Sequence, residues 1–520
     1  MGLTTDAGKL WGMTGMPATL GALQEPKATT GDLNAQVRET HTGVVFLVGD
    51  KAYKVKKPLA TDFLDFSTPE LREHACKHEV ALNRRLAPDS YLGLGHFSGP
   101  ADCPAEPVII MRRYADSTRL TSMVKDGRPV HDHLAAIAET LARFHDNAHR
   151  SRDIDSHGTV GGVSVRWQQN LLELERYWDT VIPRESLHEI ARLAAQFRRG
   201  RAVLFAERIT DHRIVDGHAD LLADDIFCLP EGPVMLDCLE FDDHLRYVDI
   251  IDDAAFLAMD LEFLGRKDLG DYFLDEYRRR AGDAAPHALR DFYTAYRAVV
   301  RAKVDCIRVA QGRRDAIADA RRHIDIALDH LRAGTVRLIV VGGYPGSGKT
   351  TLSRALAQEI GAQVISTDDV RRELWHAGAI AGQVGELNGG LYTPENVSAV
   401  YDEVLRRACL LLSSGSSVIL DGTWRDPGQR ERARKIASET SSPIVEFRCS
   451  LPLAKASARI EGSANPRRTP RLRSRRRWRN STTSRKEATR STPVGHSPSR
   501  LRRPSRYAAL RPSRQWEPNV

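Results

Sequence analysis

Residues 336–351 have the sequence VRLIVVGGYPGSGKTT, and this stretch decides how the C-terminal part of the 520-residue chain folds. The apolar run that opens it is typical of a buried strand in a parallel sheet. The glycine-rich turn that follows matches GxxxxGK(S/T) at every required position, and Gly343, Gly346 and Gly348 let its backbone N–H groups face a phosphate. The stretch therefore predicts a strand, a phosphate-binding loop and the start of a helix.

Side chains of the same loop complete a predicted nucleotide site. We expect Lys349 to reach the β- and γ-phosphate oxygens and the Thr350 hydroxyl to ligate Mg²⁺. Ser347 and Thr351 belong to the same predicted phosphate-binding set. ATP and Mg²⁺ are thus the predicted cofactors.

Further strand-like segments follow the loop, with helical patterns between them: QVISTD (363–368), SVILDG (417–422) and PIVEFRC (443–449). This rhythm predicts a parallel sheet with helices on both faces. Asp421 ends one strand, where it is placed to hold Mg²⁺ through water. Asp368 and Arg371 follow another strand, where a carboxylate can accept a hydroxyl proton and an arginine can hold an anion. The alternative interpretation of 366–373 is a capped helix start, with Thr367 or Asp368 as the cap.

These motifs resemble the P-loop kinases of the polynucleotide-kinase, zeta-toxin and gluconate-kinase type, which carry a similar D-x-x-R after the second strand. The resemblance implies that Asp368 is the general base and that Arg371 binds the acceptor.

A second acidic cluster lies more than a hundred residues earlier, in HADLLADDIF (218–227). Asp220 stands two residues after a histidine, and Asp225 five residues after Asp220. Asp237 follows one short predicted hairpin. Upstream, YKVKK (53–57) places a lysine on a strand, and we align Lys56 as the functional one, with Lys54 on the same face. Glu79, on a predicted helix, is its candidate partner.

The ordered set resembles the catalytic loop H-x-D-x-x-x-x-N and its surroundings in protein kinases and aminoglycoside phosphotransferases. The resemblance implies that Asp220 is the base, that Asp225 and Asp237 bind Mg²⁺, and that Lys56 and Glu79 serve the nucleotide. Two features depart from the pattern, because Asp225 replaces the usual Asn and no kinase-type glycine-rich loop is present. Over residues 35–463, phrases such as LDFSTPELREHAC and LDCLEFDDHLRYVD resemble a bacterial fusion of an aminoglycoside-phosphotransferase-like domain with a P-loop kinase-like domain.

The predicted fold is therefore a two-domain α/β protein. We expect a mobile leader over 1–33, an α+β kinase-like domain over 34–333, and an incomplete parallel-sheet P-loop domain over 334–463. The remaining segment, 464–520, is a predicted disordered tail with 17 Lys+Arg against 2 Asp+Glu. Its composition suggests a shifted reading frame, and the alternative is a nucleic-acid-binding arm.

Composition excludes several other classes. No apolar run is long enough for a membrane helix, and the first residues, MGLTTDAGKLWGMTG, lack the basic start and apolar centre of a signal peptide, so we expect a cytoplasmic protein without a membrane partner. The seven cysteines form no CxxC pair, which favours reduced thiols. The pairs His74/His78 and His145/His149 have helical spacing, but without a third ligand we interpret them as solvated or core histidines.

The sequence predicts an ATP-dependent phosphotransferase that moves the γ-phosphoryl group to a hydroxyl-bearing acceptor. The alternative is a non-catalytic regulator in which ATP binding sets the relation of the two domains.

Overall fold

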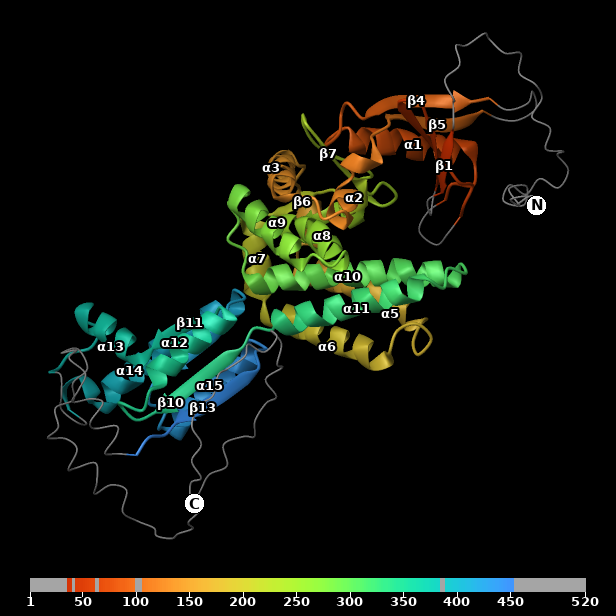
Figure 1. Ribbon diagram of the computed structural model, residues 1–520. Helices are drawn as coiled ribbons and strands as arrows, with labels where there is room; N and C mark the ends of the chain where they lie inside the picture. The colour runs from red at the N-terminus through yellow and green to blue at the C-terminus, as the bar shows by residue number, and fades with distance from the viewer. Residues whose placement is uncertain (1–34, 40–42, 61–64, 99–104, 384–388, 453–520) are drawn as a thin grey trace.

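The computed structural model describes residues 35–39, 43–60, 65–98, 105–383 and 389–452. The chain is an α/β protein in two parts, a mixed N-terminal part drawn in red to green and a C-terminal parallel-sheet part drawn in teal to blue (Figure 1). The predicted fold class is confirmed. The leader predicted for 1–33 and the tail predicted for 464–520 lie outside the described residues. Among the described residues, no helix combines the length and apolar character needed to cross a membrane.

The N-terminal part begins with a five-stranded antiparallel sheet in the order β1-β2-β3-β5-β4. Its strands are β1 (Gln36–Glu39), β2 (Gly43–Val48), β3 (Lys51–Lys56), β4 (Tyr91–Phe97) and β5 (Glu106–Arg112). A tight turn joins β2 to β3, and Gly49 adopts a φ of 57° there, a conformation that glycine reaches without strain.

Helix α1 (Pro69–Asn83) packs against this sheet (Figure 1). Thr68 caps it by accepting a hydrogen bond from the Leu71 N–H, and Pro69 stands at the first helical position, where its missing N–H costs nothing. Cys76 and Val80 of α1 share a buried hydrophobic cluster with Ala52 of β3 and Ile109 of β5, and this cluster holds the helix against the sheet.

A helical region follows, interrupted by two short antiparallel sheets of two strands each, β6 with β9 and β7 with β8. Its strands are β6 (Ile214–Asp216), β7 (Ile226–Leu229), β8 (Gly232–Met235) and β9 (Tyr247–Asp249). Its helices are α2 (Leu120–Lys125), α3 (His131–Asn147), α4 (Arg152–His157), α5 (Val160–Glu175), α6 (Arg184–Gly200), α7 (Ala202–Thr210), α8 (Ile250–Phe263), α9 (Lys267–Arg280), α10 (His287–Ala310) and α11 (Ala316–Ala333), with short 3-10 turns that include η3 (Ala223–Asp225) and η4 (Asp243–Arg246). Helix α8 is apolar on nearly all sides and lies at the centre, between α9 and α10.

The C-terminal part is a four-stranded parallel sheet in the order β11-β12-β10-β13. The strands are β10 (Leu338–Gly343), β11 (Gln363–Ser366), β12 (Val418–Asp421) and β13 (Ile444–Cys449). The helices are α12 (Lys349–Ile360), α13 (Thr367–His376), α14 (Pro394–Ser413) and α15 (Pro427–Glu439), and η5 (Gly390–Tyr392) is a short turn. Asp421 pairs in register with Val341 of β10 and Ser366 of β11, so three strands end together at one edge of the sheet.

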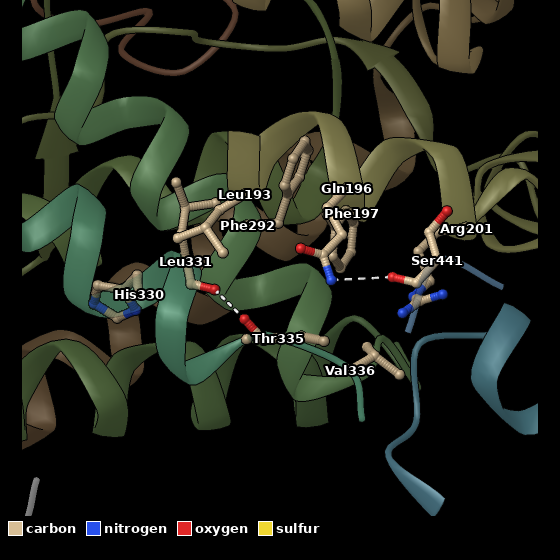
Figure 2. Close-up of a pocket in the computed structure, with 12 residues that line it drawn as sticks. Leu193, Gln196, Phe197, Arg201, Phe292, His330, Leu331, Thr335, Val336 and Ser441 are labelled. Carbon is tan, nitrogen blue, oxygen red and sulfur yellow. Dashed lines mark hydrogen bonds between the residues drawn. The ribbon is translucent and has the colours of Figure 1, made fainter. Parts of the chain in front are cut away.

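The two parts meet where α6 gives way to α7. Arg201 is 1 % exposed and donates from Nη1 to the Thr440 carbonyl at 2.8 Å, and Gln196 donates to the Ser441 carbonyl at 3.1 Å (Figure 2). A cavity of about 10 Å³ lies beside these contacts, roughly the space that a single water requires. The P-loop part is therefore packed closely on the first part at this junction.

Candidate active sites

The glycine-rich loop connects β10 to α12, so that Lys349 and Thr350 stand in the first helical turn and the exposed Thr351 follows them. Gly346 and Gly348 adopt φ values of 78° and 97°, which only glycine reaches readily. At Gly343, a Cβ atom would lie 2.6 Å from the Cys449 carbonyl oxygen. The loop thus has the backbone form and the crowding that its glycines predict.

The strand edge beside the loop carries a hydroxyl and a carboxylate in contact. Thr350 Oγ1 donates to Asp421 Oδ2 at 2.8 Å, and Asp421 is 2 % exposed. Ser347 Oγ, within the loop, is buried and has no hydrogen-bond partner among the described residues. A buried polar atom without a partner is costly unless a ligand satisfies it. This donor set fits a bound triphosphate with Mg²⁺, the metal held by Thr350 and by Asp421 through water.

Asp368 and Arg371 lie on the first turn of α13, next to that edge. Ser366 caps the helix by accepting from the N–H groups of Asp368 and Asp369, so the cap lies one residue before the predicted Thr367 or Asp368. Asp368 is left exposed and its carboxylate accepts from Arg371 Nη1 at 2.8 Å.

Arg371 is itself largely buried. Its guanidinium lies 4.7 Å from the centre of the Tyr392 ring, and its Nε atom has no hydrogen-bond partner among the described residues. Burial raises the pKa of the Tyr392 hydroxyl. The pair therefore places an exposed carboxylate against a largely buried guanidinium.

In the N-terminal part, two lysines of β3 share one glutamate of α1. Lys54 Nζ lies 2.8 Å from Glu79 Oε1 and 2.6 Å from Asp237 Oδ1, whereas Lys56 Nζ lies 2.7 Å from Glu79 Oε2 and 2.6 Å from Glu240 Oε1. Both lysines and Glu79 are buried. The sequence alignment selects Lys56, but Lys54 is the lysine that contacts the predicted metal ligand Asp237.

The opposite charges of these lysines and carboxylates keep one another ionised despite burial. Burial lowers the pKa of Lys54, but the carboxylates of Asp237 and Glu79 outweigh burial and leave that pKa well above its ordinary value. Burial raises the pKa of Glu79, but Lys54 and Lys56 outweigh it and bring the pKa down to about 2. A buried carboxylate between two lysines is thus charged at neutral pH.

The H-x-D loop is fixed by an aspartate that sequence reasoning missed. Asp253, fully buried on α8, accepts from the His218 N–H at 2.7 Å and from the Ala219 N–H at 2.8 Å. Ala219 adopts a φ of 67°, and these hydrogen bonds hold that uncommon conformation. The signal was an aspartate pair, Asp252 and Asp253, inside the otherwise apolar run 250–259, because buried carboxylates need partners.

The predicted base and metal ligands gather around the end of this loop. Burial raises the pKa of Asp220 to about 6, with Arg301 acting in the opposite direction. Burial, together with the charges of Asp237 and Asp220, raises the pKa of Asp225 well above its ordinary value. The loop therefore concentrates acidic groups, and a bound divalent cation would reduce the repulsion between their negative charges.

The described residues contain no group of three or more His, Cys, Asp or Glu side chains arranged to hold a metal ion by themselves. Mg²⁺ rarely needs such a group, since one or two carboxylates together with substrate phosphates and water suffice. Asp225 and Asp237 fit that pattern.

The histidine pairs play other parts. His145 is buried, with Nδ1 2.6 Å from the Tyr277 hydroxyl and Nε2 3.0 Å from Asp253 Oδ2, so it supports the aspartate that orders the H-x-D loop. His78 lies 2.9 Å from Asp243 Oδ1, and His149 is exposed.

Comparisons with known proteins concern both parts of the chain. Residues 338–488 match the family model described as an AAA domain, and the match extends beyond residue 463. An uncharacterized protein of Mycobacterium tuberculosis, Rv2004c, is 60% identical over 428 residues, which is 82% of this chain and 86% of the relative, and a Mycobacterium bovis protein matches equally. The chain belongs to this mycobacterial family.

Smaller likenesses concern one part each. The shikimate kinase of Corynebacterium diphtheriae is 29% identical over 127 residues, which is 22% of this chain and 71% of that enzyme. Among solved structures, the GDP and kanamycin complex of APH(2″)-IIIa has a TM-score of 0.36 and 15% identity, and a choline/ethanolamine kinase family protein from Mesorhizobium loti has a TM-score of 0.35 and 14% identity. Each covers 57% of this chain and is itself covered to 92%. These likenesses are consistent with the fusion of an aminoglycoside-phosphotransferase-like part with a P-loop kinase-like part that the sequence resembles.

Proposed function

We propose that this protein transfers the γ-phosphoryl group of ATP to a hydroxyl-bearing acceptor at the loop between β10 and α12. The observation that carries the proposal is the contact between Thr350 and Asp421, which joins the phosphate-binding loop to the acidic end of β12. Asp368 and Arg371 lie at the end of the neighbouring strand, on the side where an acceptor would enter.

Each residue has a separate task in this reaction. The loop N–H groups and Lys349 bind the phosphates, and Thr350 and Asp421 hold Mg²⁺, which supplies charge neutralisation to the transferring group when it is bound. Asp368 accepts the proton of the attacking hydroxyl. Arg371 binds an anionic group of the acceptor and thereby orients that hydroxyl.

The likeness to shikimate kinase supports this choice of acceptor, because shikimate is a small molecule with hydroxyl groups and a carboxylate. An acceptor of that kind matches an aspartate and an arginine held side by side. We therefore extend the proposal to small hydroxy acids or phosphorylated polyols at the P-loop site.

The kinase-like part carries a second phosphotransfer site in this proposal. Lys54, held by Glu79, binds the nucleotide phosphates, Asp225 and Asp237 bind Mg²⁺, and Asp220 serves as the base. Two chemically similar sites on different scaffolds explain why one chain carries both acidic clusters.

The test measures ADP formation by the full chain with ATP and Mg²⁺, with and without a panel of hydroxy acids and polyols. We expect acceptor-dependent ADP that disappears with EDTA. At the P-loop site we expect Lys349→Ala to reduce turnover by about 100-fold or more. Lys435→Ala, which removes an exposed lysine of α15, is the control and should match the wild type. ATP binding without ADP formation for any acceptor would favour the nucleotide-sensing regulator instead.

A further inference from the structure

Helix α10 carries two arginines one turn apart, and the first of them contacts the H-x-D loop. Arg297 is 4 % exposed and donates from Nε to Asp252 Oδ1 at 2.7 Å and from Nη1 to the Ala219 carbonyl at 3.0 Å. Ala219 directly precedes Asp220, so Arg297 holds the backbone of the predicted base. The Nη2 atom of Arg297 is buried and has no hydrogen-bond partner among the described residues.

Arg301 lies one turn further along α10, on the same face of the helix. It is partly exposed, and within the described parts of the chain its guanidinium makes neither a hydrogen bond nor an ion pair. Burial raises the pKa of Asp220 and of Asp260, and the charge of Arg301 acts in the opposite direction on both, while Arg297, one turn away, contacts the Ala219 carbonyl. Asp260, on α8, accepts a hydrogen bond from the Ala223 N–H at 2.8 Å and so supports the loop.

A guanidinium with unused donors beside a base is suited to bind an anion together with a hydroxyl. A planar fork of N–H groups matches a carboxylate or phosphate, and such charge-assisted contacts are strong where water is partly excluded. A cationic acceptor at the same place would meet the like charges of Arg297 and Arg301. The P-loop part repeats the arrangement, because Asp368 stands beside Arg371.

We propose, resting on the phosphotransferase function above, that the kinase-like site takes an acceptor with a carboxylate or phosphate monoester group, which Arg301 binds while Asp220 faces the acceptor hydroxyl. The hydroxyl oxygen forms a bond to the γ-phosphorus and its proton passes to Asp220. The bond from that phosphorus to the β–γ bridging oxygen breaks, and ADP leaves. The preference separates this site from acceptors that carry ammonium groups.

The experiment uses the full chain with Lys349→Ala, which silences the P-loop site. ADP formation is measured with glucuronate, glucose 6-phosphate, glucose and glucosamine, which present one sugar ring with a carboxylate, a phosphate, no charge and a positive charge. We expect kcat/KM to be highest for an anionic sugar, and Asp220→Asn to abolish transfer. Arg301→Ala should lower kcat/KM for that sugar by about tenfold or more and leave kcat/KM for glucose unchanged. Arg301→Lys should recover part of the loss.

Arg308→Ala is the matched control, because Arg308 lies on the same helix but pairs with Asp305, away from the loop. An anionic preference that persists in Arg301→Ala, or a preference for glucosamine, would overturn the inference.

A binding measurement covers the case in which none of these sugars is a substrate. Inorganic phosphate is titrated calorimetrically into the same chain with its nucleotide sites filled by MgADP. We expect Arg301→Ala, and not Arg308→Ala, to weaken phosphate binding at least about fivefold. Equal binding by all three proteins would refute the anion site. Arg301-dependent phosphate binding without transfer to any acceptor would instead retain the site and refute the phosphotransferase function.

Discussion

Thr350 donates a hydrogen bond from its hydroxyl to Asp421 Oδ2 at 2.8 Å, and this contact joins the phosphate-binding loop to the end of β12. A hydroxyl has one proton and two lone pairs, so Thr350 can keep this hydrogen bond while a lone pair faces a cation. The hydrogen bond thereby aims the threonine oxygen before any nucleotide arrives. Because Asp421 is almost fully buried, the orientation is protected from competition by water.

The contact predicts how Mg²⁺ dependence responds to substitution. Thr350→Val removes the hydroxyl and keeps the shape, so we expect the gain in ATP affinity that Mg²⁺ provides to fall about 10- to 100-fold. Thr350→Ser keeps the hydroxyl and should stay close to the wild type. Calorimetric titration of ATP with Mg²⁺ and with EDTA gives the ratio directly. A valine variant within threefold of the wild type would show that Thr350 does not hold the metal.

The two lysines of β3 should separate into one that serves binding and one that serves stability. Lys56 is 1 % exposed, contacts Glu79 and Glu240, and lies 4.8 Å from the centre of the Phe66 ring. Lys56→Met leaves buried carboxylates short of a partner, and we expect it to lower the free energy of unfolding by about 3 kcal/mol.

Lys54→Met should cost less stability, since Glu79 keeps Lys56 and the side chain of Asp237 is 42% exposed. It should instead abolish ATP binding by the kinase-like part, measured in the Lys349→Ala background. Thermal unfolding and calorimetry on both variants test the division. Loss of binding in Lys56→Met, with a normal melting temperature, would reverse the assignment.

His330 predicts a loss of stability at alkaline pH. Burial lowers the pKa of His330, but hydrogen bonds to Asp291 and Glu262, at 2.7 and 2.8 Å, outweigh burial and raise the pKa to about 9. The folded protein therefore holds this proton more tightly than the unfolded chain, whose histidine has a pKa of 6.5. The stabilisation is complete below about pH 6.5 and is lost as the pH rises through 9, by up to about 3 kcal/mol.

Urea unfolding at pH 6, 7.5 and 9 checks this window. The difference in unfolding free energy between the wild type and His330→Gln should shrink as the pH rises, while His149→Gln, at an exposed position, should show no such trend. Parallel curves for the wild type and His330→Gln would show that folding does not raise the pKa of His330.

The extent to which the sequence predicted the sites follows from how their residues are connected. The phosphate-binding loop and the H-x-D loop are continuous segments, so the positions of Thr350 and Asp220 within them could be recognised from the spacing of neighbouring residues. The fold was predictable for a similar reason, because strand and helix periods are local. The choice between Lys54 and Lys56 was not local, since alternate strand residues share a face and only the position of Asp237 separates them.

Residues that act from a distance were beyond the sequence. Asp253 contacts a loop 34 and 35 residues earlier, and Arg301 belongs to a helix, α10, that packs on α8. Neither residue belongs to a motif, and such packing is set by the whole core. A buried charge in an apolar helix was nevertheless a usable signal, because such groups are rarely left unpaired.

Two glycine substitutions, one at the junction between the two parts and one away from it, should change stability in opposite directions. Gly200 ends α6 against the loop between α15 and β13, and a Cβ atom there would lie 2.0 Å from the Thr440 carbonyl oxygen. Gly200→Ala should therefore push that loop away and weaken the docking of the P-loop part by about 1–3 kcal/mol. Gly161→Ala is the matched control, because a Cβ on this exposed helical glycine would have no neighbour nearer than 3.7 Å and should stabilise α5 by up to about 1 kcal/mol.

Limited proteolysis of the connecting segment 334–337, with the chain otherwise folded, measures the docking. We expect faster cleavage in Gly200→Ala and slower or equal cleavage in Gly161→Ala. ATP binding should survive in both variants, since the strand edge that carries Thr350 and Asp421 lies in the P-loop part itself. Equal cleavage of Gly200→Ala and the wild type would mean that the parts do not depend on this contact.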